Sequence, residues 1–160
     1  MTHSFFGGVY PATRKDVTRR KPLARLSRAP QEIVIPLVMC ADGPATPMVR
    51  PGDPVAIGQP IARRGQTGAA AFASVSGRVA AIEDRPHPWG RRSPAIVIHN
   101  DDRSEHYEGR PAPLDPRQLT LEQLVERVEW AGIVGMGGGA FPTWEKIARS
   151  AGRVDTLIVN

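Results

Sequence analysis

The fold of this chain of 160 residues is decided by the stretch Phe72-Ala73-Ser74-Val75-Ser76-Gly77-Arg78-Val79-Ala80-Ala81-Ile82. Small or polar residues separate the apolar ones on either side of Gly77, which is typical of a strand, a turn and a second strand. A further strand is predicted at Ala95-Ile96-Val97-Ile98-His99, ahead of a polar run. Short strands punctuated by Gly and Pro predict a small β-barrel or sandwich.

Two earlier segments also have the strand pattern. The run Ile33-Val34-Ile35-Pro36-Leu37 predicts a strand that Pro36 confines to a sheet edge, because proline cannot donate to a central ladder. Residues 51–62 place apolar side chains between Gly and Pro turns. We therefore expect residues 32–100 to form one β-rich domain. Its predicted interior contains Val55, Ile57, Ile61, Val75, Val79, Ile82, Ile96 and Ile98.

The composition bounds the class of protein. Apolar side chains make up 41% of the chain and charged ones 23%, which excludes a disordered or fibrous protein. No apolar run approaches the roughly 18 residues of a membrane helix, so we expect a soluble or peripheral protein. Cys40 is the only cysteine, and the histidines lack metal-ligand spacing. We therefore expect no disulfide, no cysteine-bound cluster and no zinc site within this chain.

Residues 1–31 are expected to form an extended basic arm. The formal net charge of the chain is +5. Against Asp16 alone, the arm has the basic residues Arg14, Lys15, Arg19, Arg20, Lys21, Arg25 and Arg28. Such a segment is either a solvated arm or a contact for anionic lipid or an acidic protein. Nucleic acid is not an expected partner, because no DNA- or RNA-binding motif accompanies the charge.

The pattern changes after a polar, proline-containing segment at 101–118, which is predicted to be a linker. Residues 119–160 are helical and rich in glycine. Thr120 and Gln123 have the spacing of a capping box, and apolar residues follow at helical spacing until Gly132. This pattern predicts the first helix of the chain.

A second helix is predicted at 143–151. Thr143 is its expected N-cap, and Gly152 its expected end. Residues 154–160 then have the pattern of a buried strand.

Between the predicted helices lies Gly132-Ile133-Val134-Gly135-Met136-Gly137-Gly138-Gly139-Ala140-Phe141-Pro142-Thr143-Trp144-Glu145-Lys146. Glycines at this density permit positive φ or the close approach of a flat ligand. A Gly-rich loop that leads into a helix directs N–H groups at a phosphate, and Lys146 lies one turn inside that helix. The loop matches neither the Walker A nor the Rossmann motif. On composition alone a structural turn, with Phe141 and Trp144 in packing roles, stays open.

The pattern Gly135-x-Gly137-Gly138-x-x-Phe141-Pro142-Thr143-x-x-Lys146 resembles the flavin-mononucleotide loop shared by the flavoprotein of respiratory complex I and the RnfC protein of the Rnf electron-transport complex. The opening Phe6-Gly7-Gly8-Val9-Tyr10-Pro11 resembles that of RnfC. The stretches Val49-x-Pro51-Gly52-Asp53-x-Val55-x-x-Gly58-Gln59-x-Ile61 and Ser74-Val75-Ser76-Gly77-x-Val79 are similar to its barrel-sandwich hybrid domain, a relative of lipoyl and biotinyl carriers. The resemblance covers essentially the whole chain.

This resemblance implies an α+β protein in which a small β-rich barrel-sandwich hybrid domain precedes the truncated start of an α/β flavin-binding domain. The implied FMN site consists of Gly135, Gly137, Gly138, Gly139, Lys146 and Asn160. Phe141 would lie beside the nicotinamide of NAD(H). The chain would be the N-terminal part of a longer subunit, inactive alone, whose remainder holds two 4Fe-4S clusters.

Such a subunit passes electrons between NAD(H), FMN and its clusters in a membrane complex that couples ferredoxin:NAD oxidoreduction to ion translocation. The resemblance implies a peripheral location at the cytoplasmic face of the bacterial inner membrane, with the other subunits of the Rnf complex as partners.

Two alternatives and one departure accompany this interpretation. A cobalamin-reductase-like flavoprotein shares the flavin loop, although the N-terminal barrel favours RnfC. A non-catalytic docking module with a purely structural Gly loop is the competing class. The carrier turn reads Arg63-Arg64-Gly65-Gln66-Thr67-Gly68 and has no modifiable Lys, so transfer by a swinging arm is not expected.

Overall fold

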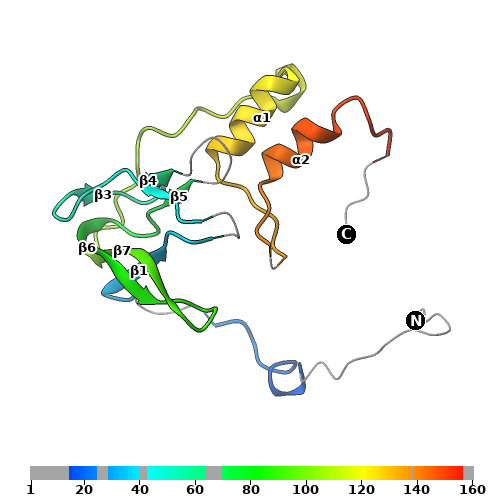
Figure 1. Cartoon of the computed structure of the whole chain (residues 1–160). Coiled ribbons are helices and arrows are strands. Elements are labelled where there is room, and N and C mark those ends of the chain that lie inside the picture. The colour runs from blue at the N-terminus through cyan, green and yellow to red at the C-terminus, as the bar shows by residue number, and fades with distance from the viewer. Residues whose placement is uncertain (1–14, 25–28, 40–42, 64–69, 138, 157–160) are drawn as a thin grey trace.

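The computed structural model describes residues 15–24, 29–39, 43–63, 70–137 and 139–156. Their strands form two antiparallel sheets, and two α-helices lie together at one side of them (Figure 1). The strands are β1 (Glu32–Pro36), β2 (Thr46–Pro47), β3 (Pro54–Val55), β4 (Pro60–Arg63), β5 (Ala71–Phe72), β6 (Gly77–Pro86) and β7 (Arg92–Asn100). The helices are the 3₁₀ turns η1 (Lys15–Val17) and η2 (Pro116–Gln118) and the α-helices α1 (Leu121–Trp130) and α2 (Thr143–Ser150).

The larger sheet has four strands in the order β1-β7-β6-β3. Its centre is the hairpin of β6 and β7, the two longest strands described. The register shifts between Val79 and Ala81, and an extra residue of this kind bends a strand and increases its twist. β1 lies at the edge of the sheet, as Pro36 predicted.

The core lies between this sheet and a three-stranded sheet of order β2-β4-β5. Its buried members are Leu37, Ala45, Val49, Val55, Ile61, Ala62, Ala71, Ala73, Val75, Val79, Ile96 and Ile98. Six of the predicted interior residues are among them, whereas Ile82 is partly buried against the cluster and Ile57 is half-buried. Each fully buried isoleucine stabilises the fold by about 1.5–3 kcal/mol. The prediction of a small β-barrel or sandwich is confirmed.

Gly77 shows why the stretch 72–82 specifies this packing. It begins β6 with a φ of 153°, and a Cβ there would overlap the carbonyl oxygen of His99 and lie 2.9 Å from its carbonyl carbon. Only a residue without a side chain allows the backbones of β6 and β7 to approach this closely.

The first helix follows the prediction. The hydroxyl of Thr120 accepts from the backbone N–H of Gln123, whose side-chain oxygen accepts from the N–H of Thr120. Gly132, with a φ of 64°, follows the helix. A Cβ on Gly132 would lie 2.6 Å from Cε2 of Phe72, and the ring of Phe72 packs edge-to-face on Trp130 at 5.9 Å. α1 therefore rests directly on β5.

The second helix corrects one prediction. Thr143 is the first residue of α2 and not its cap, since Pro142 occupies the N-cap position without a side-chain capping bond. The reason is that the backbone N–H of Thr143 already donates to the carbonyl of Ile133, 3.0 Å away. Gly152, with a φ of 69°, follows the helix as predicted.

The predicted strand at 154–160 is not observed in its described part. Residues 154–156 are exposed and pair with no described strand, and Val154 is 64% exposed. A strand needs a neighbour to satisfy its backbone groups, and none of the described strands lies beside these residues. The remaining residues, 157–160, lie outside the described ranges. None of the described helices is long and apolar enough to cross a membrane.

The segment after β7 is attached to the barrel. The N–H of Ile57 donates to the carbonyl of Glu105 at 2.8 Å, and the N–H of Tyr107 donates to the carbonyl of Ile57 at 3.0 Å. The guanidinium of Arg110 donates to the same carbonyl of Ile57 at 3.0 Å. These bonds fix the start of the connection between the sheets and the helical pair.

Candidate functional site

The loop between α1 and α2 is closed at its base by backbone hydrogen bonds. The N–H of Gly135 donates to the carbonyl of Phe141 at 2.8 Å, and Val134 forms an isolated antiparallel bridge with Pro142. Nearer the tip, the N–H of Ala140 donates to the carbonyl of Gly137 at 3.2 Å. The glycine-rich tip is therefore held on a narrow, defined stem.

Lys146 lies one turn inside α2 and turns back towards this stem. Its Nζ is 5.8 Å from the centre of the Phe141 ring. A Cβ built on Gly135 would approach the same Nζ to 3.1 Å, closer than most real Cβ contacts. The structure thus brings together three of the predicted site residues, and Gly135 leaves the space that the ammonium group of Lys146 occupies.

The other predicted residues divide between an open side and the part of the chain outside the described ranges. A Cβ on Gly137 or Gly139 would meet nothing within 4 Å, so open space faces the backbone at both positions. Phe141 is exposed beside them. Gly138 and Asn160 lie outside the described residues, and their predicted roles stay predictions.

The charge around Lys146 is suited to an anionic group. In the described ranges no carboxylate pairs with Lys146, because the neighbouring Glu145 pairs with Arg149 on the same helix. An ammonium group of this kind beside an open, glycine-lined surface fits a phosphate or an electron-rich ring. The residues present therefore fit a flavin mononucleotide. Within the same ranges, no group of three His, Cys, Asp or Glu residues is placed to hold a metal ion.

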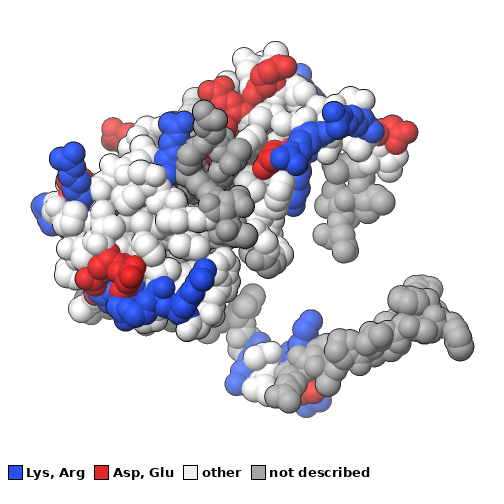
Figure 2. All heavy atoms as spheres, in the orientation of Figure 1, with Lys and Arg blue, Asp and Glu red and all other residues white. Residues whose placement is uncertain are grey.

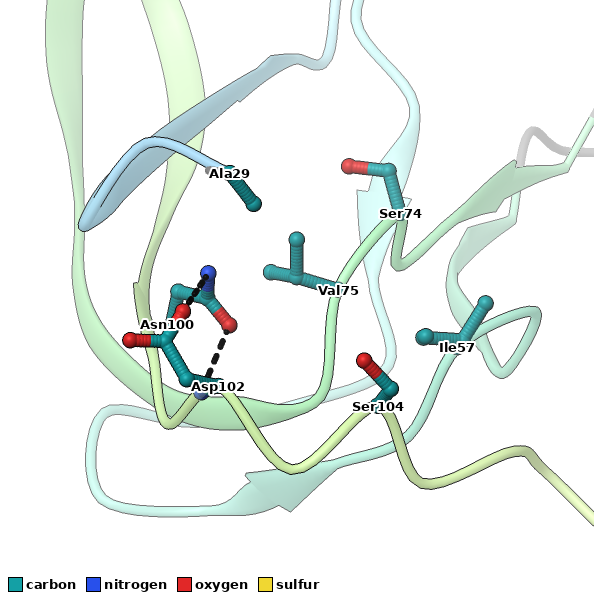
Figure 3. A pocket seen from close by; sticks show the side chains of 7 residues that line it. All are labelled: Ala29, Ile57, Ser74, Val75, Asn100, Asp102 and Ser104. Atoms are coloured by element: carbon teal, nitrogen blue, oxygen red, sulfur yellow. Dashed lines mark hydrogen bonds between the residues drawn. The ribbon is translucent and has the colours of Figure 1, made fainter. Parts of the chain in front are cut away.

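A separate cavity of about 420 Å³ opens on the barrel beside the end of β7 (Figure 3). Its lining consists of Ala29, Ile57, Ser74, Val75, Asn100, Asp102 and Ser104. Asn100 and Asp102 are joined by two hydrogen bonds of 3.1 and 3.0 Å, and the φ of Asp102 is 58°. Among the described residues, the lining has no basic side chain and contains none of the predicted site residues, so this cavity is not suited to an anionic cofactor.

Beside this cavity, one carboxyl group is stabilised in its charged form. The hydroxyl of Ser76 donates to Oδ1 of Asp101 at 2.6 Å, and the N–H of Arg103 donates to the same oxygen at 3.0 Å. The bond from Ser76, followed by that from Arg103, lowers the pKa of Asp101. Because Ser76 is buried directly before β6, this contact anchors the segment after β7 to the core.

A barrel-like pair of sheets, without a lysine in its 63–68 turn, that continues into two helices joined by a Gly-rich loop defines a class: carrier-type β-domains joined to a cofactor-loop segment. The chain belongs to the RnfC family, because the family model of the RnfC barrel sandwich hybrid domain matches residues 3–103. The predicted barrel-sandwich hybrid fold and the resemblance to RnfC are thereby confirmed.

Three relatives, each the C component of its complex, illustrate the match. The chain is 38% identical to that of the proton-translocating ferredoxin:NAD(+) oxidoreductase complex of Clostridium ljungdahlii, over 100% of this chain and 35% of that protein. It is 38% identical to that of the ion-translocating oxidoreductase complex of Vibrio cholerae, over 98% and 20% of the two chains. It is 35% identical to that of the Na(+)-translocating ferredoxin:NAD(+) oxidoreductase complex of Acetobacterium woodii, over 98% and 36%. The chain therefore spans between a fifth and about a third of the length of these relatives.

Proposed function

We propose that this chain is the N-terminal part of an electron-transfer subunit in a ferredoxin:NAD oxidoreductase complex coupled to ion translocation. The reaction is the one after which the relatives are named. The subunit would lie peripherally at the cytoplasmic face of the membrane, among the other subunits of the complex. Residues 32–100 would be its barrel-sandwich hybrid domain, and residues 119–160 the start of its FMN- and NAD(H)-binding domain.

The observation that carries the proposal is the position of the Lys146 ammonium group, which pairs with no described carboxylate, beside the open glycine-lined tip. Gly135 would keep this ammonium group close to the loop, while Gly137 and Gly139 would let the flavin approach the backbone without a side chain in between. Phe141, exposed beside Lys146, would contact the nicotinamide. Gly138 and Asn160 would complete the bed.

FMN, when bound, supplies the hydride and single-electron chemistry, and the protein supplies binding, orientation and electrostatics. Lys146 would hold a positive charge next to the isoalloxazine or the phosphate and so favour the anionic forms of the cofactor. The iron–sulfur clusters that would accept the electrons lie outside these 160 residues in our proposal, because Cys40 is the only cysteine here.

The test is the affinity of the complete subunit for FMN, measured by quenching of flavin fluorescence. A charge-assisted hydrogen bond contributes about 1.5–3 kcal/mol, so Lys146→Ala should weaken binding by roughly ten- to a hundredfold. Gly137→Val should weaken it further, because a branched side chain would occupy the space of the flavin. Arg153→Ala, which removes an exposed cation after α2, is the matched control and should bind FMN normally.

The isolated chain of 160 residues should bind FMN weakly or not at all, because Asn160 is the first residue of the expected run of flavin contacts. Parental FMN affinity in folded Lys146→Ala and Gly137→Val subunits would contradict the proposal. The loop would then be structural, and the chain would be a docking module of a redox complex.

A further inference from the structure

The turn between β6 and β7 is a surface that the proposed function does not use. It runs from His87 to Arg91, and the N–H of His87 donates to the carbonyl of Arg91 at 2.8 Å. Trp89 lies in this turn with 49% of its surface exposed. An indole in such a position costs free energy in water unless it meets a partner.

Three contacts hold the indole of Trp89 in place. The His87 ring packs edge-to-face on it at 4.7 Å, and the guanidinium of Arg91 lies 5.8 Å from its centre. The N–H of Trp89 donates to Nδ1 of His87, while Nε2 of His87 donates to the carbonyl of Val38 at 3.0 Å. The ring is therefore ordered before it binds anything, so binding would cost little side-chain entropy.

The charge around Trp89 is positive. Arg91 and Arg92 are exposed. The nearby carboxylates of Glu83 and Glu32 do not cancel them, because both pair with Arg85, at 2.7 and 3.1 Å. With the exposed Met39, which follows Val38, these residues form what we call the hairpin surface: Met39, Trp89, Arg91 and Arg92.

A second segment has the same chemistry. Residues 15–24, which include η1, are exposed throughout. They place the apolar side chains of Val17 and Leu23 among the cations Lys15, Arg19, Arg20 and Lys21, with Asp16 as the one acidic residue. Figures 1 and 2 show η1 and the end of the β6–β7 hairpin towards the same end of the molecule, with basic side chains at both.

We propose that the hairpin surface and residues 15–24 together bind the surface of an anionic lipid bilayer. Trp is favoured at the boundary between headgroups and acyl chains, and basic residues are attracted to anionic headgroups. A protein partner is disfavoured, because a stable protein interface buries about 800 Å² per side. Here the apolar side chains stand singly on a hairpin turn and on an exposed arm. The proposal is independent of the flavin loop.

The test is flotation of the chain with vesicles of phosphatidylcholine that contain about 30% phosphatidylglycerol, compared with phosphatidylcholine alone. We expect binding only to the anionic vesicles, and its loss when NaCl rises from about 50 to about 500 mM. Each basic residue near the surface contributes about a factor of five in partitioning, so Arg91→Gln with Arg92→Gln should reduce the partition coefficient about 30-fold. Trp89→Phe should abolish the blue shift of tryptophan fluorescence on binding.

Two control variants make the test specific. Arg117→Gln with Arg153→Gln removes the same charge from exposed positions outside the hairpin surface and should leave partitioning within about threefold. Trp144→Phe should keep the blue shift. Equal binding to both kinds of vesicle, or equal losses in the Arg91/Arg92 and Arg117/Arg153 pairs, would overturn the proposal. Absence of binding to anionic vesicles at low salt would also overturn it and would assign the hairpin surface to a protein partner.

Discussion

Replacing Gly77 by alanine tests the packing of the central hairpin most sharply. The new Cβ would overlap the carbonyl oxygen of His99 and lie 3.2 Å from Cα of Asn100. These atoms are backbone and cannot rotate away, so the start of β6 must separate from β7. Overpacking of this kind costs about 1–3 kcal/mol, and a lost ladder hydrogen bond adds about 1 kcal/mol. We expect a decrease of about 3 kcal/mol in the free energy of unfolding.

The matched control is Gly90→Ala in the β6–β7 turn. Gly90 also has a positive φ, 79°, but a Cβ there would meet nothing within 4 Å. Its cost is therefore only the left-handed backbone penalty of about 1–2 kcal/mol. Urea unfolding followed by circular dichroism measures both variants. If Gly77→Ala and Gly90→Ala lost the same stability within about 0.5 kcal/mol, the close approach of Gly77 to His99 would not matter, and our reasoning would be refuted.

Three further predictions concern the same part of the chain. Ile96→Asp buries an unpaired carboxylate in the core, so it should lower the free energy of unfolding by at least about 4 kcal/mol, whereas Leu114→Asp at an exposed position should change it by less than about 0.5 kcal/mol. Ser76→Ala removes the main cause of the lowered pKa of Asp101, so NMR titration should show that pKa rising towards the ordinary aspartate value. The parent gains stability from this contact above the ordinary aspartate pKa and loses it as the pH falls through the lowered pKa, so the acid side of the stability profile should flatten in Ser76→Ala. Gly132→Ala should push α1 away from β5 and shift the fluorescence of the Trp130 side chain to the red, because its Cβ would lie 2.6 Å from the Phe72 ring.

Local rules predicted the parts of the fold that depend on neighbouring residues. Pro36 identified the edge strand, and Thr120 with Gln123 identified the start of α1, because each effect acts within a few residues. The alternation around Val79 and Ile96 identified the core face of the central hairpin. These signals need no knowledge of distant contacts.

Long-range contacts explain what the sequence did not predict. Small side chains such as Ala62 and Ala73 are buried because the sheets curl tightly around them, and no periodicity marks them as core. Thr143 looked like a cap, but its N–H is already satisfied by Ile133. The candidate site shows the same division: the Gly-rich pattern indicated Gly135 and Lys146, whereas the placement of Trp89 against His87 depends on the folded turn.

The reduction potential of flavin bound to the complete subunit tests the central claim most directly, because it responds to a cation only if that cation faces the flavin. Lys146 would stabilise the negative charge of reduced flavin, so Lys146→Ala should lower the two-electron potential. An interaction of about 1.5–3 kcal/mol corresponds to about 30–60 mV. Arg153→Ala should leave the potential unchanged. A potential in Lys146→Ala within about 10 mV of the parent would contradict the assignment of the loop between α1 and α2 as the flavin bed.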